Sequence, residues 1–194
     1  MKKYILFIFC AVGFISCNYQ TRITPIKYYP NEFGDGNKYL LKQRFYSKIL
    51  QSSVMECSLL YERVTEGNNL NRVSFIINRR MDVMDLMPVI YVKIDSSVEK
   101  MNIQKINSQF HSEETVPISS TTTMDSTGIK TNTTNGFIDQ WYIDKFYIDF
   151  TPEMIAKIDV SKSMSYRLYY GPEPVTINYT LEKLNQLKEL FSKK

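Results

Sequence analysis

Three methionines recur at every third position in the segment RRMDVMDLMP, and their side chains suit a soft metal ion. Met81, Met84 and Met87 carry thioether sulfurs, and soft sulfur ligands select Cu(I). Methionine is also an adaptable filler of hydrophobic cores, and this segment joins two expected strands, where it could cover the edge of a sheet. The sequence favours the packing role, keeps a Cu(I) site as an alternative, and indicates no other cofactor.

Outward-facing aromatic side chains are a second feature with chemical potential. Tyr147 and Tyr169 are expected on strands, on the parity opposite to the apolar residues, and Trp141 belongs to the same aromatic-rich stretch. Neighbouring exposed rings can form a stacking surface for a sugar or a patch for a protein partner. Cross-strand aromatic pairs on a solvated face explain the same residues without a ligand. Trp141, Tyr147 and Tyr169 are therefore candidate binding residues.

Groups that commonly serve in catalysis are sparse. The single histidine, His111, is followed by two glutamates, and a histidine–carboxylate pair can act in acid–base catalysis, but its polar surroundings favour a solvated side chain. Cys57 falls on the apolar parity of an expected strand, which favours a buried, unreactive thiol. Asp139, Asp144 and Asp149 recur every five residues, so Asp144 faces away from the other two. No phosphate-binding loop, nucleophile elbow or zinc-protease motif is present.

The first seventeen residues, MKKYILFIFCAVGFISC, have the pattern of a targeting signal. Two lysines precede an uncharged run from Tyr4 to Ile15, which is too short to cross a hydrocarbon core of about 30 Å and suits a secretory signal peptide. The end of this run, Phe14-Ile15-Ser16-Cys17, resembles the lipobox of bacterial lipoproteins. The resemblance covers residues 1–17 and implies cleavage after residue 16 and acylation of Cys17, with palmitate as a typical chain. Ordinary cleavage near Ser16 and an uncleaved anchor remain alternatives.

The resemblance also implies a location. Two or three acyl chains on Cys17 would anchor the protein stably to a membrane. Asn18 follows the cysteine, rather than the aspartate that marks inner-membrane retention in enteric bacteria, which favours the outer membrane. The formal charge of +4 falls to +2 once residues 1–16 are removed, so nucleic acid is not an expected partner.

The rest of the chain suits one domain. We expect a signal peptide over residues 1–16, the acylated cysteine and a flexible tether over 17–37, and one domain over 38–194 with a Ser/Thr-rich loop at 112–136. Cys57 is the only cysteine after Cys17, so no disulfide forms within the domain unless the acylated residue takes part.

The expected elements give an α+β fold. Leu41, Phe45 and Ile49 recur at spacings of four and predict a helix over residues 38–51. Alternating apolar residues predict strands at 55–61, 73–77, 88–95, 145–150, 164–170 and 175–179. Thr151 and Thr180 are expected to cap two later helices. We expect a curved antiparallel sheet with helices packed on one face; the element order of the last fifty residues is similar to the carboxyl-terminal part of other bacterial lipoproteins, which implies no site.

The function predicted from these features is that of a lipid-anchored cell-envelope protein. It binds a protein partner or a surface glycan, or has a structural role, and contacts the membrane through Cys17. An envelope hydrolase with a site assembled from distant residues is the alternative. An enzyme should bring His111 or several buried carboxylates into one pocket, whereas a binding module should expose aromatic side chains.

Overall fold

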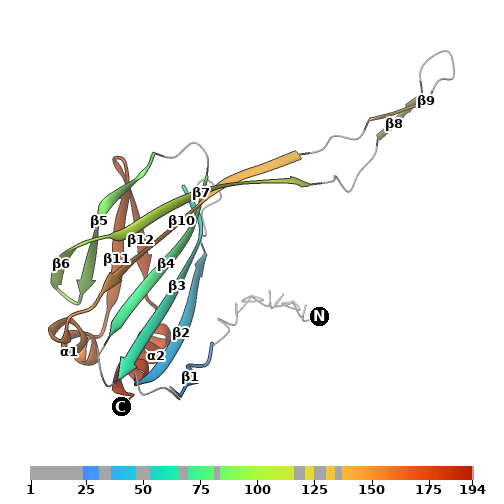
Figure 1. Cartoon of the computed structure of the whole chain (residues 1–194). Coiled ribbons are helices and arrows are strands. Elements are labelled where there is room, and N and C mark those ends of the chain that lie inside the picture. Colours follow the sequence, from blue (N-terminus) through green and yellow to red (C-terminus); the bar gives the residue numbers. More distant parts are fainter. Residues whose placement is uncertain are drawn as a thin grey trace, which may run out of the picture.

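A computed structural model describes residues 24–30, 36–46, 53–65, 70–80, 84–115, 121–124, 130–133 and 137–193. These residues form two main antiparallel β-sheets, a separate two-stranded ribbon and two short helices (Figure 1).

The larger sheet has six strands in the order β1-β2-β3-β4-β10-β7. Their bounds are β1 Lys27–Tyr29, β2 Asn37–Tyr46, β3 Val54–Thr65, β4 Asn71–Arg80, β10 Phe137–Asp149 and β7 Gln104–Thr115. The smaller sheet has the order β12-β11-β5-β6. Its strands are β12 Glu173–Asn178, β11 Met164–Tyr170, β5 Leu86–Ile94 and β6 Ser97–Asn102. The ribbon is β8 (Thr121–Met124) with β9 (Lys130–Thr133), and the helices are α1 (Pro152–Val160) and α2 (Leu181–Ser192).

Alternate side chains of the strands fill the space between the two sheets. Val73, Phe75 and Ile77 on β4 are fully buried, as expected for the inward row of a strand with a side-chain period of two. The Phe75 ring lies 4.7 Å from Phe146 on β10 and 5.1 Å from Tyr166 on β11, measured between ring centroids. The two sheets therefore meet around this ring, and the strands predicted at 73–77, 145–150 and 164–170 are confirmed.

One long bent segment joins the two sheets. β6 ends the smaller sheet, β7 ends the larger one, and Ile103 lies between them, with its N–H donating to the carbonyl of Pro88 at 3.0 Å. Lys105 has φ 51°, which marks the bend. β7 then runs beside β10 within the larger sheet as far as the pair His111↔Trp141, and beyond this pair the two strands leave the sandwich as a two-stranded arm that points towards β8 and β9 (Figure 1).

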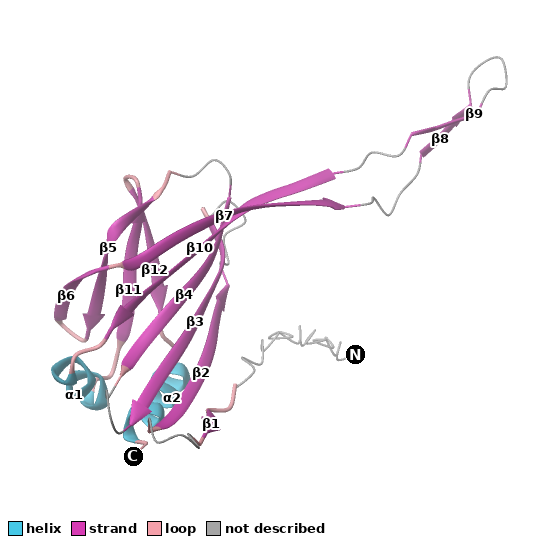
Figure 2. Ribbon diagram, in the orientation of Figure 1, coloured by secondary structure: helices cyan, strands magenta, loops and turns pink. Residues whose placement is uncertain are grey.

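Both helices begin at the residues that the sequence predicts. The hydroxyl of Thr151 accepts from the N–H of Met154 at 3.3 Å, with Pro152 in the first turn. Thr180 accepts from the N–H of Lys183 at 3.3 Å. The two helices lie at one end of the sandwich (Figure 2). The buried side of α2 consists of Leu184, Leu187, Leu190 and Phe191.

The predicted fold class is wrong. Strands make up 67% of the structure, which has two packed sheets and only two short helices among its described residues. The core therefore lies between two sheets, and the helices close one end of it instead of covering a sheet face. The protein is a mainly β fold rather than the expected α+β fold.

The helix predicted over 38–51 is also wrong, because residues 37–46 form β2 and pair with β3 throughout. A spacing of four returns to the same side of both a helix and a strand, so Leu41 and Phe45 could not distinguish the two. Gln43 faces inward and is only 3% exposed. Because it is polar, it interrupts the alternation of apolar residues that would have indicated a strand. Ile49 lies outside the described residues.

Two segments expected to be irregular contain strands. Lys27–Tyr29, within the predicted tether 17–37, form β1 and pair with Leu40 to Lys38 of β2. In the expected loop 112–136, β7 continues to Thr115, β10 begins at Phe137, and β8 and β9 pair from Thr121↔Thr133 to Met124↔Lys130. Threonine favours strands, so a Ser/Thr-rich composition does not prevent local pairing.

Candidate functional site

The candidate metal ligands are only partly described. Met81 lies outside the described residues, as does Cys17. Met84 and Met87 are 64% and 46% exposed, so neither fills the core. Within the described ranges, no group of three or more His, Cys, Asp or Glu side chains could hold a metal ion. The Cu(I) site stays a prediction that rests on the sequence.

The three candidate aromatic residues do not form one platform. Trp141 stacks on His111 with ring centroids 5.8 Å apart, and Tyr147 lies on the same strand six residues away, about 20 Å along a strand. The Tyr147 ring is covered by the guanidinium of Arg72, 3.8 Å from its centroid. Tyr169 is on β11 in the smaller sheet. Each ring therefore belongs to a separate local contact.

The groups that could support catalysis are not assembled into a common pocket. His111 pairs in register with Trp141 on β10, and its Nε2 atom is buried without a hydrogen-bond partner among the described residues. The Cys57 thiol is 2% exposed, and burial raises its pKa well above the ordinary value for a thiol. A thiol with a raised pKa is a poor nucleophile. In this arrangement His111 does not form an acid–base pair and Cys57 is not a reactive thiol.

A buried ion pair within the larger sheet, which the sequence did not reveal, is linked to the smaller sheet by the hydroxyl of Tyr170. Asp144 is fully buried and accepts hydrogen bonds from Arg79 Nε at 2.8 Å, from the Tyr170 hydroxyl at 2.9 Å and from the Ser108 hydroxyl. Burial, followed by the Asp144 charge, raises the pKa of Tyr170. These contacts satisfy both charges internally, so the cluster is structural. Asp144 faces away from the exposed Asp139 and the partly exposed Asp149, as the sequence predicted, and the structure shows that it faces inward.

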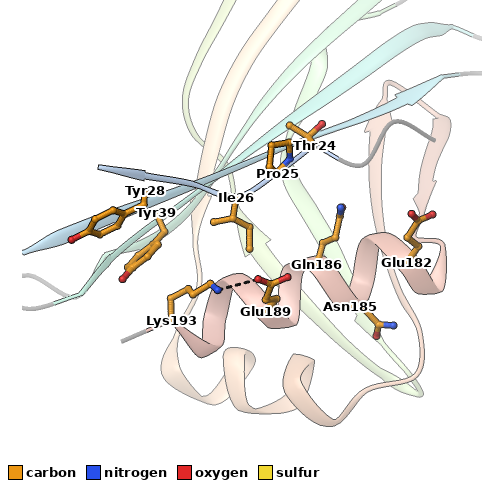
Figure 3. A pocket seen from close by; sticks show the side chains of 10 residues that line it. All are labelled: Thr24, Pro25, Ile26, Tyr28, Tyr39, Glu182, Asn185, Gln186, Glu189 and Lys193. Carbon is orange, nitrogen blue, oxygen red and sulfur yellow. Dashed lines mark hydrogen bonds and ion pairs between the residues drawn. The ribbon is translucent and has the colours of Figure 1, made fainter. Parts of the chain in front are cut away.

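The best candidate binding site is a groove between the amino-terminal segment and α2 (Figure 3). Its volume is about 880 Å³, within the range of small-ligand sites. Its lining residues come from three places in the chain: Thr24, Pro25, Ile26 and Tyr28 from the β1 segment, Tyr39 from β2, and Glu182, Asn185, Gln186, Glu189 and Lys193 from the end of the chain. A site of this kind is invisible to motif searches.

Strand pairing positions the aromatic end of the groove. Tyr28 stands directly opposite Tyr39 in the β1–β2 register, with ring centroids 5.2 Å apart and planes inclined by 39°. The Tyr28 hydroxyl donates to Asn37 Oδ1 at 2.9 Å. Tyr28 is nevertheless 52% exposed. The groove therefore presents a fixed and accessible aromatic surface beside Lys193 (Figure 3).

The helical period positions the polar side of the groove. Glu182, Gln186, Glu189 and Lys193 are separated by three or four residues, so they lie along one side of α2 and its last turn. The buried leucines of α2 occupy the other side. Lys193 Nζ and Glu189 Oε1 are 3.0 Å apart, so the pair is locally neutral. The remaining side chains offer amide donors and oxygen acceptors.

β2 holds the helix in place beneath the groove. Gln43 Nε2 donates to the carbonyl of Lys183 at 2.8 Å and to Gln186 Oε1 at 3.4 Å. At the other end of α2, Arg63 Nε donates to the carbonyl of Lys193 at 2.9 Å. Both ends of the polar stripe are thus fixed to the larger sheet. A site fixed in this way loses little conformational entropy when it binds a ligand.

Comparison with known proteins adds no family to this description, because the sequence matches no protein-family profile and no curated protein at a significant level. None of the helices among the described residues is long and apolar enough to span a membrane.

Proposed function

We propose that this protein is a lipid-anchored component of the bacterial cell envelope that binds a neutral glycan in the groove between β1 and α2. The observation that carries the proposal is the juxtaposition of the two tyrosines with the polar stripe of α2. The apolar C–H face of a sugar ring packs on an aromatic face. Amide and carboxylate groups hydrogen-bond to its hydroxyls. The groove offers both kinds of contact.

The charges of the groove favour a neutral ligand. Glu182 and Glu189 oppose an anionic sugar or a phosphate, and the ion pair between Glu189 and Lys193 compensates one of the two carboxylates. A polyhydroxylated neutral ligand avoids the desolvation cost of burying an uncompensated charge. Neutral oligosaccharides are therefore the expected class.

The position of the groove links it to the proposed anchor. Thr24 lines the groove and lies seven residues after Cys17, a span of at most about 25 Å even when fully extended. If Cys17 is acylated, the groove stays close to the membrane surface. Glycans at or near that surface are then the natural ligands, and the mass of the amino-terminal peptide tests the acylation itself.

The proposal is tested by titrating the detergent-solubilised full-length protein with a panel of neutral, anionic and cationic oligosaccharides. We expect saturable binding of a neutral oligosaccharide that is insensitive to salt, because no net charge is exchanged with the solvent. Tyr28→Ala should weaken binding about tenfold through loss of one stacking contact of roughly 1–1.5 kcal/mol. The matched control is Tyr169→Ala, which replaces a tyrosine of the smaller sheet and should leave the affinity unchanged.

Two results would reject the proposed site. One is the absence of saturable binding across the neutral panel. The other is equal affinity of the wild-type protein and the Tyr28→Ala variant, which would place the ligand elsewhere. Binding that is restricted to cationic oligosaccharides and falls with added salt would show that the carboxylates, rather than the tyrosines, select the ligand.

A further inference from the structure

The arm strand β7 is a long free edge of the six-stranded sheet (Figure 1). It spans twelve residues, Gln104–Thr115, or about 40 Å at roughly 3.4 Å per residue. β10 is its neighbour on one side, and it has no strand partner on the other side within the described part of the chain. Every second residue of such an edge directs its backbone N–H and C=O outward, where they can pair with another strand.

Most of this edge has no feature that would block pairing. The register with β10 is unbroken from Asn107↔Lys145 to Thr115↔Phe137, and the bulge lies before Asn107. The strand contains no proline. Natural proteins commonly protect edges with a proline, a bulge, a very short strand or charged side chains. The charged residues of β7 are Lys105, Glu113 and Glu114, which lie near its two ends. β1, at the opposite edge of the same sheet, has only three residues, so its short length protects that edge.

The charges along β7 are complementary to those of a second, antiparallel copy of the strand. Lys105 is near its beginning, and Glu113 is near its end; both side chains are exposed. Lys105 Nζ lies 6.0 Å from the centroid of the Tyr147 ring, and Glu113 pairs in register with Asp139, which has the same parity as Tyr147 on β10. Lys105 and Glu113 therefore lie on the same face of the sheet.

We propose that two copies of the protein associate through β7, antiparallel to each other, around a two-fold axis at Gln109. Counted along the chain, this register brings Lys105 of each copy, at the bend where the regular ladder ends, next to Glu113 of the other. The incoming ammonium also approaches Asp139, so it offsets the repulsion between two carboxylates on neighbouring strands. The two six-stranded sheets become one continuous sheet, and the β1 grooves stay open at its two outer edges. The inference is independent of the proposed glycan site.

A disulfide at the two-fold axis tests the register in intact cells. Gln109 is exposed and would lie opposite its own copy, so Gln109→Cys in the full-length protein should yield a disulfide-linked band of twice the monomer mass after mild oxidation. The matched control is Ser112→Cys, on the same exposed strand. Its Cα would be about 20 Å from its copy, beyond the 4.4–6.8 Å that a disulfide spans.

Charge reversal tests the ion pairs. Lys105→Glu should raise the dissociation constant of the dimer about tenfold to a hundredfold, because two attractive contacts become repulsive. The double variant Lys105→Glu with Glu113→Lys should restore the dissociation constant of the wild-type dimer. This recovery would exclude misfolding as the cause of the weaker association in the single variant. Mass photometry of the detergent-solubilised protein measures both variants.

Three results would overturn the proposal. The first is a wild-type protein that is monomeric, together with a Gln109→Cys variant that forms no disulfide-linked dimer. The second is a dimer whose dissociation constant changes in neither charge variant. The third is a disulfide between the Gln109→Cys variant and a different protein. The last result would show that another partner occupies the β7 edge.

Discussion

Replacing Asp144 by alanine should strongly destabilise the fold. The substitution removes the acceptor of Arg79 Nε, 2.8 Å away, and of the Tyr170 and Ser108 hydroxyls. Arg79 is 2% exposed, so its charge stays buried, and breaking such a pair costs about 3–5 kcal/mol. Arg79 keeps a contact with the exposed Asp85 at 3.2 Å, which places the expected loss near 3 kcal/mol. The total free energy of unfolding of a domain of this size is roughly 5–15 kcal/mol.

The same two strands provide a matched control. Arg72 and Asp149 also pair between β4 and β10, with Nε and Oδ1 2.6 Å apart, but their side chains are 29% and 36% exposed. Asp149→Ala should therefore lower the free energy of unfolding by less than about 1 kcal/mol. Urea unfolding followed by the fluorescence of the single tryptophan, Trp141, measures both variants, and circular dichroism checks that the transitions coincide.

The buried pair would not have this structural role if the free energy of unfolding of Asp144→Ala lay within about 1 kcal/mol of the wild-type value, or if the two alanine variants lost equal stability. A double variant, Arg79→Met with Asp144→Leu, separates an unpaired charge from a lost contact. Because apolar replacement of a buried pair is often neutral, this double variant should be more stable than Asp144→Ala alone.

Three further predictions concern single residues. The Cys57 thiol, whose pKa is raised by burial, should react with a thiol reagent only in denaturant; stoichiometric labelling of the folded protein would contradict this. Gly171→Ala should lower the free energy of unfolding by about 1–2 kcal/mol, because Gly171 has φ 57°, where a side chain is strained, and a Cβ there would meet the Met84 side chain; an unchanged urea midpoint would show that the turn tolerates the side chain. Backbone N–H groups of residues 162 and 163 hold the pKa of Asp95 below its ordinary value, so this carboxylate stabilises the fold above the unfolded-state pKa of about 4 and the stabilisation is lost as the pH falls through its folded-state pKa. Asp95→Asn should therefore flatten the decline of the urea midpoint below about pH 4, and parallel pH curves for the two proteins would refute the assignment.

The strand content was predictable wherever inward positions are uniformly apolar. On β11, and on β4 as far as Ile77, the inward side chains are apolar without interruption, and the predicted parity is the observed one. β2 was missed because Gln43 interrupts the row and because a spacing of four fits both periods. The error in fold class follows largely from that element, since a helix there implied a sheet covered on one face.

The candidate site could be predicted only in part. The cap at Thr180 predicted where α2, one wall of the groove, begins. The other wall of the groove comes from residues 24–28, which have no sustained apolar period and were expected to be a tether. Tyr28 and Glu189 are separated by more than 150 residues, and no local pattern reports that they face one groove. The buried Arg79–Asp144 pair was missed for the same reason.

Hydrogen–deuterium exchange of the full-length protein, with and without a bound neutral oligosaccharide, locates the ligand on the structure. We expect slower exchange in residues 24–29 and 182–193, the two walls of the groove, and unchanged exchange around Trp141 and Tyr169. Protection centred on Trp141, with no change in α2, would exclude the groove and would assign ligand binding to β7 and β10 instead.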